Sequence, residues 1–465
     1  MFESACLSEI KTLWSPRGAA LLAAVILASS FAAPLSAQAQ QQSGQPQANY
    51  RPIEVPDSTN ELPGDIGARA HTNHLIVLRP EQMKQATSSI PVGETPGSLA
   101  CVYQTVSPTT GCPVTGNYKN GNSGLAIPKG GSQTIAVVDA YDYPTAPADL
   151  AVFSVEFGLP LPCSTSLTSG CFEFTQVYAS GSKPAANSSW ALEASLDIEW
   201  AHAMAPGAKI VLVEAKSTSL TDLFAAVDVA SNEVRCGQPA SCSATAHGSG
   251  EVSTSWGGSE FSGESTYDVH FPQTNDIVYF AAAGDSGGQT MYPSVSPYVV
   301  SAGGTTLNRN SSGDFLSEAA WSGGGGGHSV YESAPSYQKT TVSNLVGTKR
   351  GVPDFSFDAN PNSGVFIYDS TPYDGSAGWW IVGGTSVASP SLAGIVNLAG
   401  STHVFQTSST AELDLIYSIC PKDASASCSS ANFRDITSGS AGKYNAAIGW
   451  DFTTGVGSNQ GLAGK

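Results

Sequence analysis

The sequence predicts an α/β protein with a parallel sheet, helices on both faces of that sheet and a short N-terminal extension. From residue 132 onward, short apolar runs typical of buried strands alternate with helical stretches. This alternation is the pattern of a parallel sheet. The 49 glycines and 28 prolines indicate a loop-rich globular chain and argue against a coiled coil or a helical bundle. In such a sheet, catalytic groups are expected at the carboxyl ends of the strands.

The predicted strands and helices follow one another along the chain. The first strand reads QTIAVV at 133–138 and runs into Asp139. The later strands read KIVLV at 209–213, IVYFAA at 277–282 and YVVS at 298–301. Helices are predicted between and after these strands, at 190–204, 219–234 and 385–398.

The first 39 residues have the composition of a secretory signal peptide. An apolar run at 19–33 follows Lys11 and Arg17, and residues 37–39 read AQA, a small-residue cleavage pattern. We predict a signal peptide at 1–39, a linker with room for a short pro-segment at 40–115 and the main domain at 116–465. The predicted location is secreted or periplasmic, with a retained N-terminal anchor as the alternative.

Charge and cysteine content restrict the partners and the compartment. The chain carries 20 Lys+Arg and 38 Asp+Glu, and its net charge of −18 repels nucleic acid. No later segment is apolar for long enough to span a bilayer, so no stable membrane partner is expected. Eight cysteines remain beyond residue 39, an even number that predicts disulfides in an oxidising compartment. They fall into four close pairs, for which sequential bonding is the simplest scheme: Cys101/Cys112, Cys163/Cys171, Cys236/Cys242 and Cys420/Cys428.

A candidate nucleophile lies where the last predicted helix begins. Residues 382–390 read VGGTSVASP, so Ser386 follows two glycines at the entry to a helix. The helix N-terminus stabilises negative charge, and the Ser386 N–H can donate to a developing oxyanion. An ordinary N-cap serine is the alternative. A serine nucleophile needs a base, but no histidine lies in a His-Gly-Thr-His type segment, and His71 and His74 fall in the N-terminal segment.

Two carboxylates one helical turn apart are candidates for that base. Residues 190–200 read WALEASLDIEW, which places Glu193 and Asp197 on one helix face. In a partly dry cleft the pair would share a proton, and one apparent pKa would rise. Such a pair can accept a proton from Ser386 in acid, where imidazole is already protonated. The alternative is two solvated surface carboxylates, and the apolar residues around the pair argue against it.

A third carboxylate lies at the end of an apolar strand. Residues 280–288 read FAAAGDSGG, so Asp285 lies in a glycine-rich turn. When protonated, through low pH or a raised pKa, its carboxyl group can donate a hydrogen bond to an oxyanion. A turn-forming aspartate is the alternative.

Glu193, Asp197, Asp285 and Ser386, in this order and in these local contexts, resemble the sedolisin family of serine-carboxyl peptidases. The resemblance covers roughly residues 132–465 of the predicted domain at 116–465. It implies a subtilisin-like fold and acid-acting endopeptidase activity on polypeptide substrates, through an acyl-enzyme. It also implies that Ser386 is the nucleophile, that Glu193 is the general base and then acid, and that Asp197 orients Glu193. Asp285 would supply the oxyanion donor.

The resemblance extends to a substrate strand and to a calcium site. Ser255, Trp256 and Gly257 look like the family strand that lines the substrate cleft. Near the C-terminus, the resemblance implies one structural calcium ion, with a structural cluster of turns as the alternative. The implied ligands are the side chains of Asp435 and Asp451 and the main-chain carbonyls of Ile436, Ala447 and Gly449.

The chain departs from the family pattern at several points, and two rival functions stay open. Family members usually carry a large folded pro-domain, for which 40–115 is too short, and Ser389 stands where a small alanine is more usual. One rival is a subtilisin-type neutral serine peptidase, suggested by Asp139 at the end of TIAVVD. The other is an inactive secreted binding protein on a peptidase scaffold. A monomer is expected.

Overall fold

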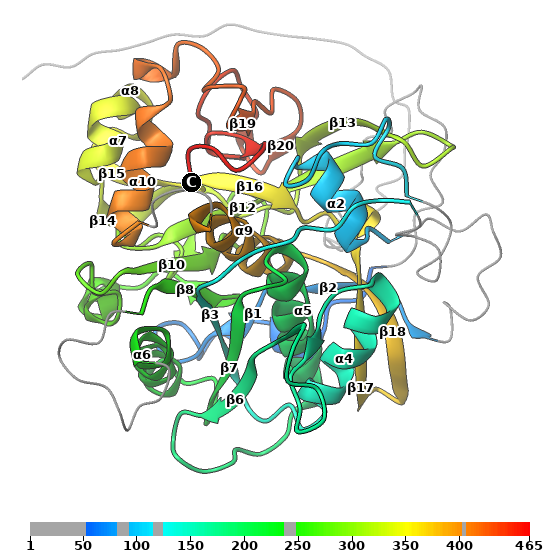
Figure 1. Cartoon of the computed structure of the whole chain (residues 1–465). Helices are drawn as coiled ribbons and strands as arrows, with labels where there is room; N and C mark the ends of the chain where they lie inside the picture. The colour runs from blue at the N-terminus through cyan, green and yellow to red at the C-terminus, as the bar shows by residue number, and fades with distance from the viewer. Residues whose placement is uncertain (1–52, 81–92, 115–123, 237–247, 402–405) are drawn as a thin grey trace, which may run out of the picture. The chain divides into compact units, whose positions relative to one another are not determined.

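A mainly parallel sheet forms the centre of the computed structural model, which describes residues 53–80, 93–114, 124–236, 248–401 and 406–465 (Figure 1). The strand order is β19-β22-β16-β12-β10-β8-β3-β7-β6, and every neighbouring pair from β22 to β6 is parallel. The predicted fold class is confirmed. The strands are β3 (Thr134–Ala140), β6 (Phe174–Tyr178), β7 (Lys209–Ala215), β8 (Gly250–Thr254), β10 (Ile277–Ala282), β12 (Val300–Arg309), β16 (Phe355–Asp358), β19 (Phe433–Arg434) and β22 (Ser458–Asn459).

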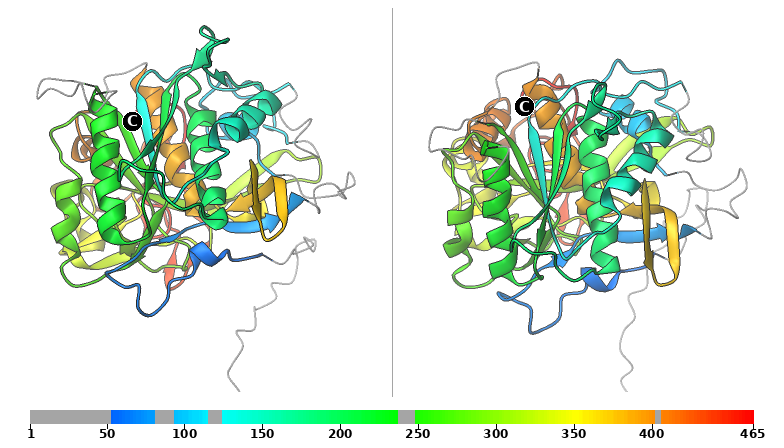
Figure 2. Two further views of the ribbon diagram at one scale, coloured as in Figure 1. Left: turned by 90° about the horizontal axis from the view of Figure 1, so that it is seen from below. Right: turned by 60° about the horizontal axis from the view of Figure 1, so that its bottom comes forward.

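Alternate residues of β3 pack into two different cores, one on each face of the sheet. Ile135 and Val137 join the cluster of α5 (Ser188–Met204) and α9 (Thr385–Gly400), whereas Ala136 and Val138 join that of α6 (Leu220–Cys236). Figure 2 shows α5 and α6 flanking the strands. Side chains alternate between faces along a strand, so a run that is apolar at every position fits a sheet covered on both sides.

The helix α5 is buried along almost its whole length, although it carries several ionisable side chains. It starts after Asn187, whose side chain accepts hydrogen bonds from the N–H groups of Ser189 and Trp190, each at 3.1 Å. It packs against α9 and against the sheet. A helix that is buried on every side is usually apolar all round. Because α5 has no exposed face, the carboxylates that it carries lie inside the protein.

Residues 53–80 belong to the same compact unit as the rest of the described chain. In this segment, β1 (His71–Thr72) pairs antiparallel with β9 (Trp256–Ser259), and β2 (Leu75–Leu78) pairs antiparallel with β18 (Ser376–Gly383). The described part of the predicted linker is thus packed structure, because its apolar LIVL run completes a sheet with β18. The predicted processing boundaries stay predictions, and the predicted signal peptide lies outside the described residues.

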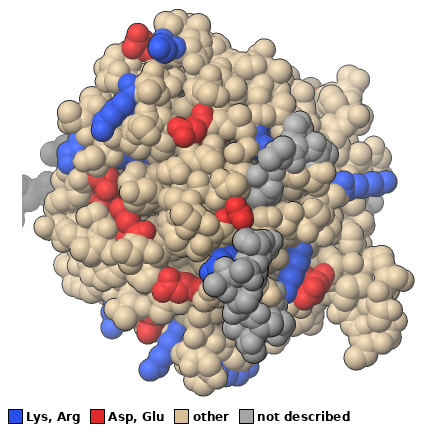
Figure 3. All heavy atoms as spheres, turned by 60° about the vertical axis from the view of Figure 1, so that its left-hand side comes forward, with Lys and Arg blue, Asp and Glu red and all other residues tan. Residues whose placement is uncertain are grey.

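Three of the predicted disulfides are present, joining Cys101 to Cys112, Cys163 to Cys171 and Cys420 to Cys428. Cys236 is disulfide-bonded as well, and Cys242 of the fourth predicted pair lies outside the described residues. None of the helices that the structure describes is both long enough and apolar enough to cross a membrane. On the face drawn in Figure 3, charged side chains are separated by uncharged surface, as expected when only 12% of residues are charged.

Candidate active site

Ser386 lies in the first turn of α9, just after the glycine pair that ends β18. The N-cap of α9 is Gly384, so Ser386 is not the ordinary N-cap serine of the alternative reading. Gly384 has a φ of 115°, and a Cβ there would lie 2.1 Å from the Asn73 carbonyl oxygen and 2.5 Å from Asp285 Oδ2. Only glycine fits this close approach. The Ser386 hydroxyl is buried, donates to the Ser255 carbonyl oxygen at 3.2 Å and accepts from the Asn73 N–H at 3.2 Å.

Asp285 follows β10 and faces the residue before Ser386. Its Oδ1 accepts hydrogen bonds from both the N–H and the hydroxyl of Thr385, each at 2.8 Å. Its Oδ2 is buried without a hydrogen-bond partner among the described residues. Burial raises the pKa of Asp285 to about 8, and the charge of Glu193 adds to this, although the Thr385 hydrogen bonds lower it. Asp285 is therefore protonated in acid and has an oxygen free to donate.

The carboxylates of Glu193 and Asp197 on α5 are both buried, so the alternative of two solvated surface groups is wrong. Asp139, at the carboxyl end of β3, joins them. Burial raises the pKa of Asp197 well above its usual value, and the charges of Asp139 and Glu193 raise it further. Burial likewise raises the pKa of Asp139, with further contributions from Glu193 and Glu214. Asp197 and Asp139 therefore both favour their protonated forms.

Ser255 connects the carboxylate cluster to the candidate nucleophile. Its hydroxyl donates to Asp197 Oδ1 at 2.9 Å, while its carbonyl oxygen accepts from the Ser386 hydroxyl. The next residue, Trp256, is buried and donates from Nε1 to the Val138 carbonyl at 2.8 Å. These contacts hold the predicted substrate strand, including Gly257 in β9, beside Ser386.

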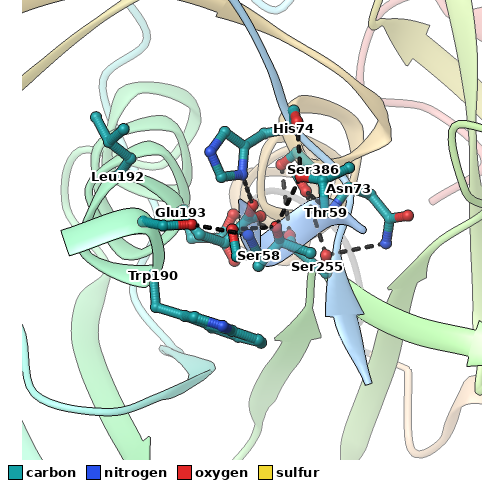
Figure 4. Close-up of polar contacts among 12 residues, drawn as sticks. Ser58, Thr59, Asn73, His74, Trp190, Leu192, Glu193, Ser255 and Ser386 are labelled. Atoms are coloured by element: carbon teal, nitrogen blue, oxygen red, sulfur yellow. Dashed lines mark hydrogen bonds and ion pairs between the residues drawn. The ribbon is translucent and has the colours of Figure 1, made fainter. Parts of the chain in front are cut away.

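Glu193 is paired with a residue that sequence reasoning set aside. His74 Nδ1 contacts Glu193 Oε2, and both side chains are fully buried (Figure 4). No hydrogen bond among the described residues joins Glu193 to Ser386. Asn73, the neighbour of His74, contacts Ser386 through its main chain. Little in the sequence indicated that Asn73 and His74 belong to the site, because they precede the apolar LIVL run in a stretch that otherwise has the composition of a linker.

The C-terminal loop brings the two predicted acidic calcium ligands to the same main-chain segment. The Gly449 N–H lies 3.2 Å from both Asp435 oxygens, and the Ala447 N–H donates to Asp451 Oδ2 at 2.8 Å. Ile436 is buried beside Asp435. Within the described ranges, no group of three or more His, Cys, Asp or Glu side chains is placed so that it could hold a metal ion. Oxygen donors suit a hard cation, and binding here would depend on main-chain carbonyls besides the two carboxylates.

No family model matches the chain, but several characterised proteins are similar to it in sequence. It is 35% identical to sedolisin of Pseudomonas sp. (strain 101) over 181 residues, which are 36% of this chain and 28% of sedolisin. It is 30% identical to kumamolisin of Bacillus sp. (strain MN-32) over 308 residues, 58% of this chain and 49% of kumamolisin. It is 35% identical to xanthomonalisin of Xanthomonas sp. (strain T-22) over 192 residues, 36% of this chain and 21% of that protein. The matched regions thus span less than half of each relative.

The fold is also similar to that of a solved structure. The structure of Pseudomonas sedolisin, a serine-carboxyl proteinase complexed with two molecules of pseudo-iodotyrostatin, aligns with a TM-score of 0.59 and 24% identity. The alignment covers 80% of this chain and 96% of that one. The chain is thus similar in sequence to sedolisin, kumamolisin and xanthomonalisin over part of their length, and it shares the fold of Pseudomonas sedolisin.

Proposed function

We propose that the protein is a secreted, acid-acting serine endopeptidase that cleaves polypeptides through an acyl-enzyme. One observation carries the proposal: two buried carboxyl groups with raised pKa values flank a buried serine in the first turn of a helix, Asp285 through its contact with Thr385 and Asp197 through Ser255. The disulfides support secretion, because such bonds persist in oxidising compartments. Relatives that are named as peptidases support the reaction class.

Each residue of the site has a role in the proposed reaction. The Ser386 hydroxyl attacks the carbonyl carbon of the substrate, and Glu193 takes the hydroxyl proton. The Ser386 N–H and the protonated Asp285 donate to the oxyanion that develops. Glu193 then returns the proton to the leaving amine, and water hydrolyses the acyl-enzyme by the same steps. Asp197 and Asp139 keep their protons beside Glu193, because burial and neighbouring carboxylates raise the pKa of each.

The subtilisin-type rival requires a histidine between an aspartate and the serine. Among the described residues, no hydrogen bond joins a histidine to Asp139 or to Ser386, and both Asp139 oxygens lack a partner. The rival of an inactive binding protein predicts no cleavage at any pH, so an activity measurement separates it from the proposal.

The pH–rate profile tests the proposed function. The purified protein is expected to hydrolyse casein in acid and to lose activity as the pH rises to about 8, because Asp285 must keep its proton to donate. kcat/KM is measured from about pH 3 to about pH 9. A maximum above neutral pH would favour the subtilisin type, and no cleavage at any pH would favour the binding protein.

A structural calcium ion at the C-terminal loop remains part of the proposal. Asp435 and Asp451 would hold it through their side chains, and the ion would stabilise the loop. Removing calcium with a chelator is expected to lower the Tm, since a ligand at about 100 times its Kd contributes about 2.7 kcal/mol. Asp435→Asn should abolish this calcium-dependent shift, while Asp414→Asn, at an exposed position of α10 (Ser409–Ser418), should retain it. Equal Tm values with and without calcium would exclude the ion.

A further inference from the structure

Three buried carboxyl groups come together where α5 packs against two neighbouring elements. Asp149 lies on α4 (Ala146–Phe157), Glu199 lies on α5 and Asp369 lies on β17 (Val365–Tyr373), and each of these residues is at most 2% exposed. The elements α4, α5 and β17 all contact one another and lie side by side in Figure 1. None of the three carboxyl groups has a role in the proposed reaction. We call Asp149, Glu199 and Asp369 the carboxyl clamp.

Two members of the carboxyl clamp tie a helix to the main chain beside them. Glu199 Oε2 accepts a hydrogen bond from the Tyr368 N–H at 3.0 Å, which joins α5 to β17. Asp149 Oδ2 accepts from the Ser370 N–H at 3.0 Å, which joins α4 to the same strand. The same oxygen of Asp149 accepts from the Tyr143 hydroxyl at 2.9 Å. Both helices are therefore held to β17 through side-chain carboxyl groups.

Asp369 is the member with an unused oxygen. Its Oδ1 accepts from the Thr371 N–H at 2.7 Å, whereas its Oδ2 is buried without a hydrogen-bond partner among the described residues. The pKa of Asp369 is raised to about 8, chiefly by burial, with an opposing effect of the Thr371 N–H and a further contribution from the charge of Asp149. Burial also raises the pKa of Glu199 well above its usual value, and the charges of Asp149 and Asp369 add to this. Asp369 and Glu199 therefore keep their protons in acid.

No basic side chain compensates the carboxyl clamp. The elements α4, α5 and β17, together with β18, contain no lysine or arginine, and no ion pair of the described residues includes Asp149, Glu199 or Asp369. His202 on α5 is buried, its Nε2 contacts the Pro160 carbonyl at 3.0 Å, and burial lowers its pKa to about 3. The other ionisable side chains of α4, α5 and β17 are Glu156, Glu193, Asp197, Tyr368 and Tyr373. Ionisation of the clamp would therefore place like charges in the interior without a counterion, which is costly.

The elements that the carboxyl clamp joins also carry the candidate catalytic groups. The helix α5 carries Glu193 as well as Glu199. The strand β17 pairs antiparallel with β18, whose last residue, Gly383, precedes the turn that leads to Ser386. A change in the packing of α5 against β17 would therefore change how the proposed base lies relative to the proposed nucleophile.

We propose that the carboxyl clamp is an acid-dependent conformational switch, which holds α4 and α5 against β17 only while Glu199 and Asp369 are protonated. Loss of these protons leaves three buried negative charges that repel one another, and α5 is released from β17. The switch itself does not depend on the proposed function, but its consequence for catalysis rests on that function, because α5 carries Glu193.

Protonation of the clamp affects the free energy of unfolding with a definite sign. A carboxyl group whose pKa is higher in the folded chain binds more protons there than in the unfolded chain. Its contribution to stability is complete below the unfolded pKa, near about 4, and is lost as the pH rises toward the folded pKa. Within that window each such group raises the equilibrium constant of unfolding about tenfold per pH unit. For Asp369 the window ends at about pH 8.

Urea unfolding between about pH 4 and about pH 8 tests the switch in the inactive Ser386→Ala background, which excludes self-cleavage. Asp369→Asn and Glu199→Gln keep the size of the side chain and an oxygen that accepts a hydrogen bond. Each is expected to reduce the pH slope by up to about tenfold per pH unit, so that the variants match the background in acid and are more stable near about pH 8. The matched control is Asp374→Asn in the turn of the same hairpin, where the carboxylate is 74% exposed. It should keep the slope of the background.

Hydrogen exchange, corrected for intrinsic rates, shows where the structure loosens. In the Ser386→Ala background, protection in residues 193–200 and 365–373 should fall between about pH 5 and about pH 8, and Asp369→Asn should abolish this fall. In the active chain, the loss of acid-assayed casein hydrolysis during incubation near about pH 8 should slow at least about tenfold in Asp369→Asn. Where one of the two clamp variants fails to fold, the other is measured.

Several outcomes would overturn the switch. These are an unchanged pH slope in the clamp variants, an equal reduction of the slope by Asp374→Asn, or protection in α5 and β17 that does not depend on pH. Equal rates of inactivation in the wild type and Asp369→Asn would overturn its consequence for catalysis. If the pH slopes behave as expected but the wild type cleaves casein at no pH, the proposed function fails while the switch stands.

Discussion

Replacing Ser386 with alanine is expected to lower kcat on casein by at least about 10⁴-fold, because the acyl-enzyme can no longer form. The hydroxyl removed is buried and makes two hydrogen bonds, to Ser255 and to Asn73. The fold should survive, since the helix start depends on Gly384 and on main-chain bonds and not on this hydroxyl. The measurement is casein hydrolysis at the pH of maximal activity, with the Tm as a check on folding.

Ser389→Ala is the matched control for this variant. Ser389 is also buried in the first turns of α9, but its hydroxyl contacts Ser253 Oγ at 2.9 Å and the Thr254 carbonyl at 3.3 Å, not the site. Its loss should change kcat by no more than about tenfold, the scale of one buried hydrogen bond. Residual activity of Ser386→Ala within about tenfold of wild type would show that another group is the nucleophile.

Two substitutions of Asp285 should distinguish the effect of removing its side chain from the effect of removing only its titratable proton. Asp285→Ala removes the proposed oxyanion donor, and a loss of about 10² to 10³ in kcat is expected. Asp285→Asn keeps a donor that does not titrate, and its oxygen can still accept from Thr385. The asparagine variant should therefore retain more activity than the alanine variant.

The pH dependence of these variants gives the sharper measurement. Burial raises the pKa of Asp285 to about 8, so the wild-type donor is present in acid and is lost as the pH rises through that value. In Asp285→Asn, the alkaline limb of kcat/KM should move upward, because no proton is lost from residue 285. Identical profiles for the wild type and Asp285→Asn, with equal losses in the two variants, would exclude Asp285 as the donor.

Much of the sheet could be predicted because its strands are long and apolar. The run at 277–282 corresponds to β10, and the run at 133–138 lies within one or two residues of β3. The run at 298–301 marks only the start of β12, which continues through a polar stretch to Arg309. The strand β8, Gly250–Thr254, was missed, because GEVST has neither alternation nor a long apolar run and is buried only through its neighbours.

The candidate catalytic residues could be picked out from the sequence because each lies in a local pattern that suits a catalytic group. A helical turn between Glu193 and Asp197 fixes their shared face, and a glycine-rich turn presents Asp285. The structure then brings these residues and Ser386 to one buried place. The contacts that decide the burial come from distant parts of the chain, and no local pattern reports them.

The sequence alone determined which titratable side chains the chain carries and in which order they occur along it. Only the tertiary structure decided which of them touch: His74 meets Glu193 across 119 positions, and Asn73 meets Ser386 across 313. Propensity and periodicity act over a few residues, whereas such pairings depend on how whole strands share a sheet edge. For that reason the sequence does not show that Asn73 and His74 lie against α9 and α5.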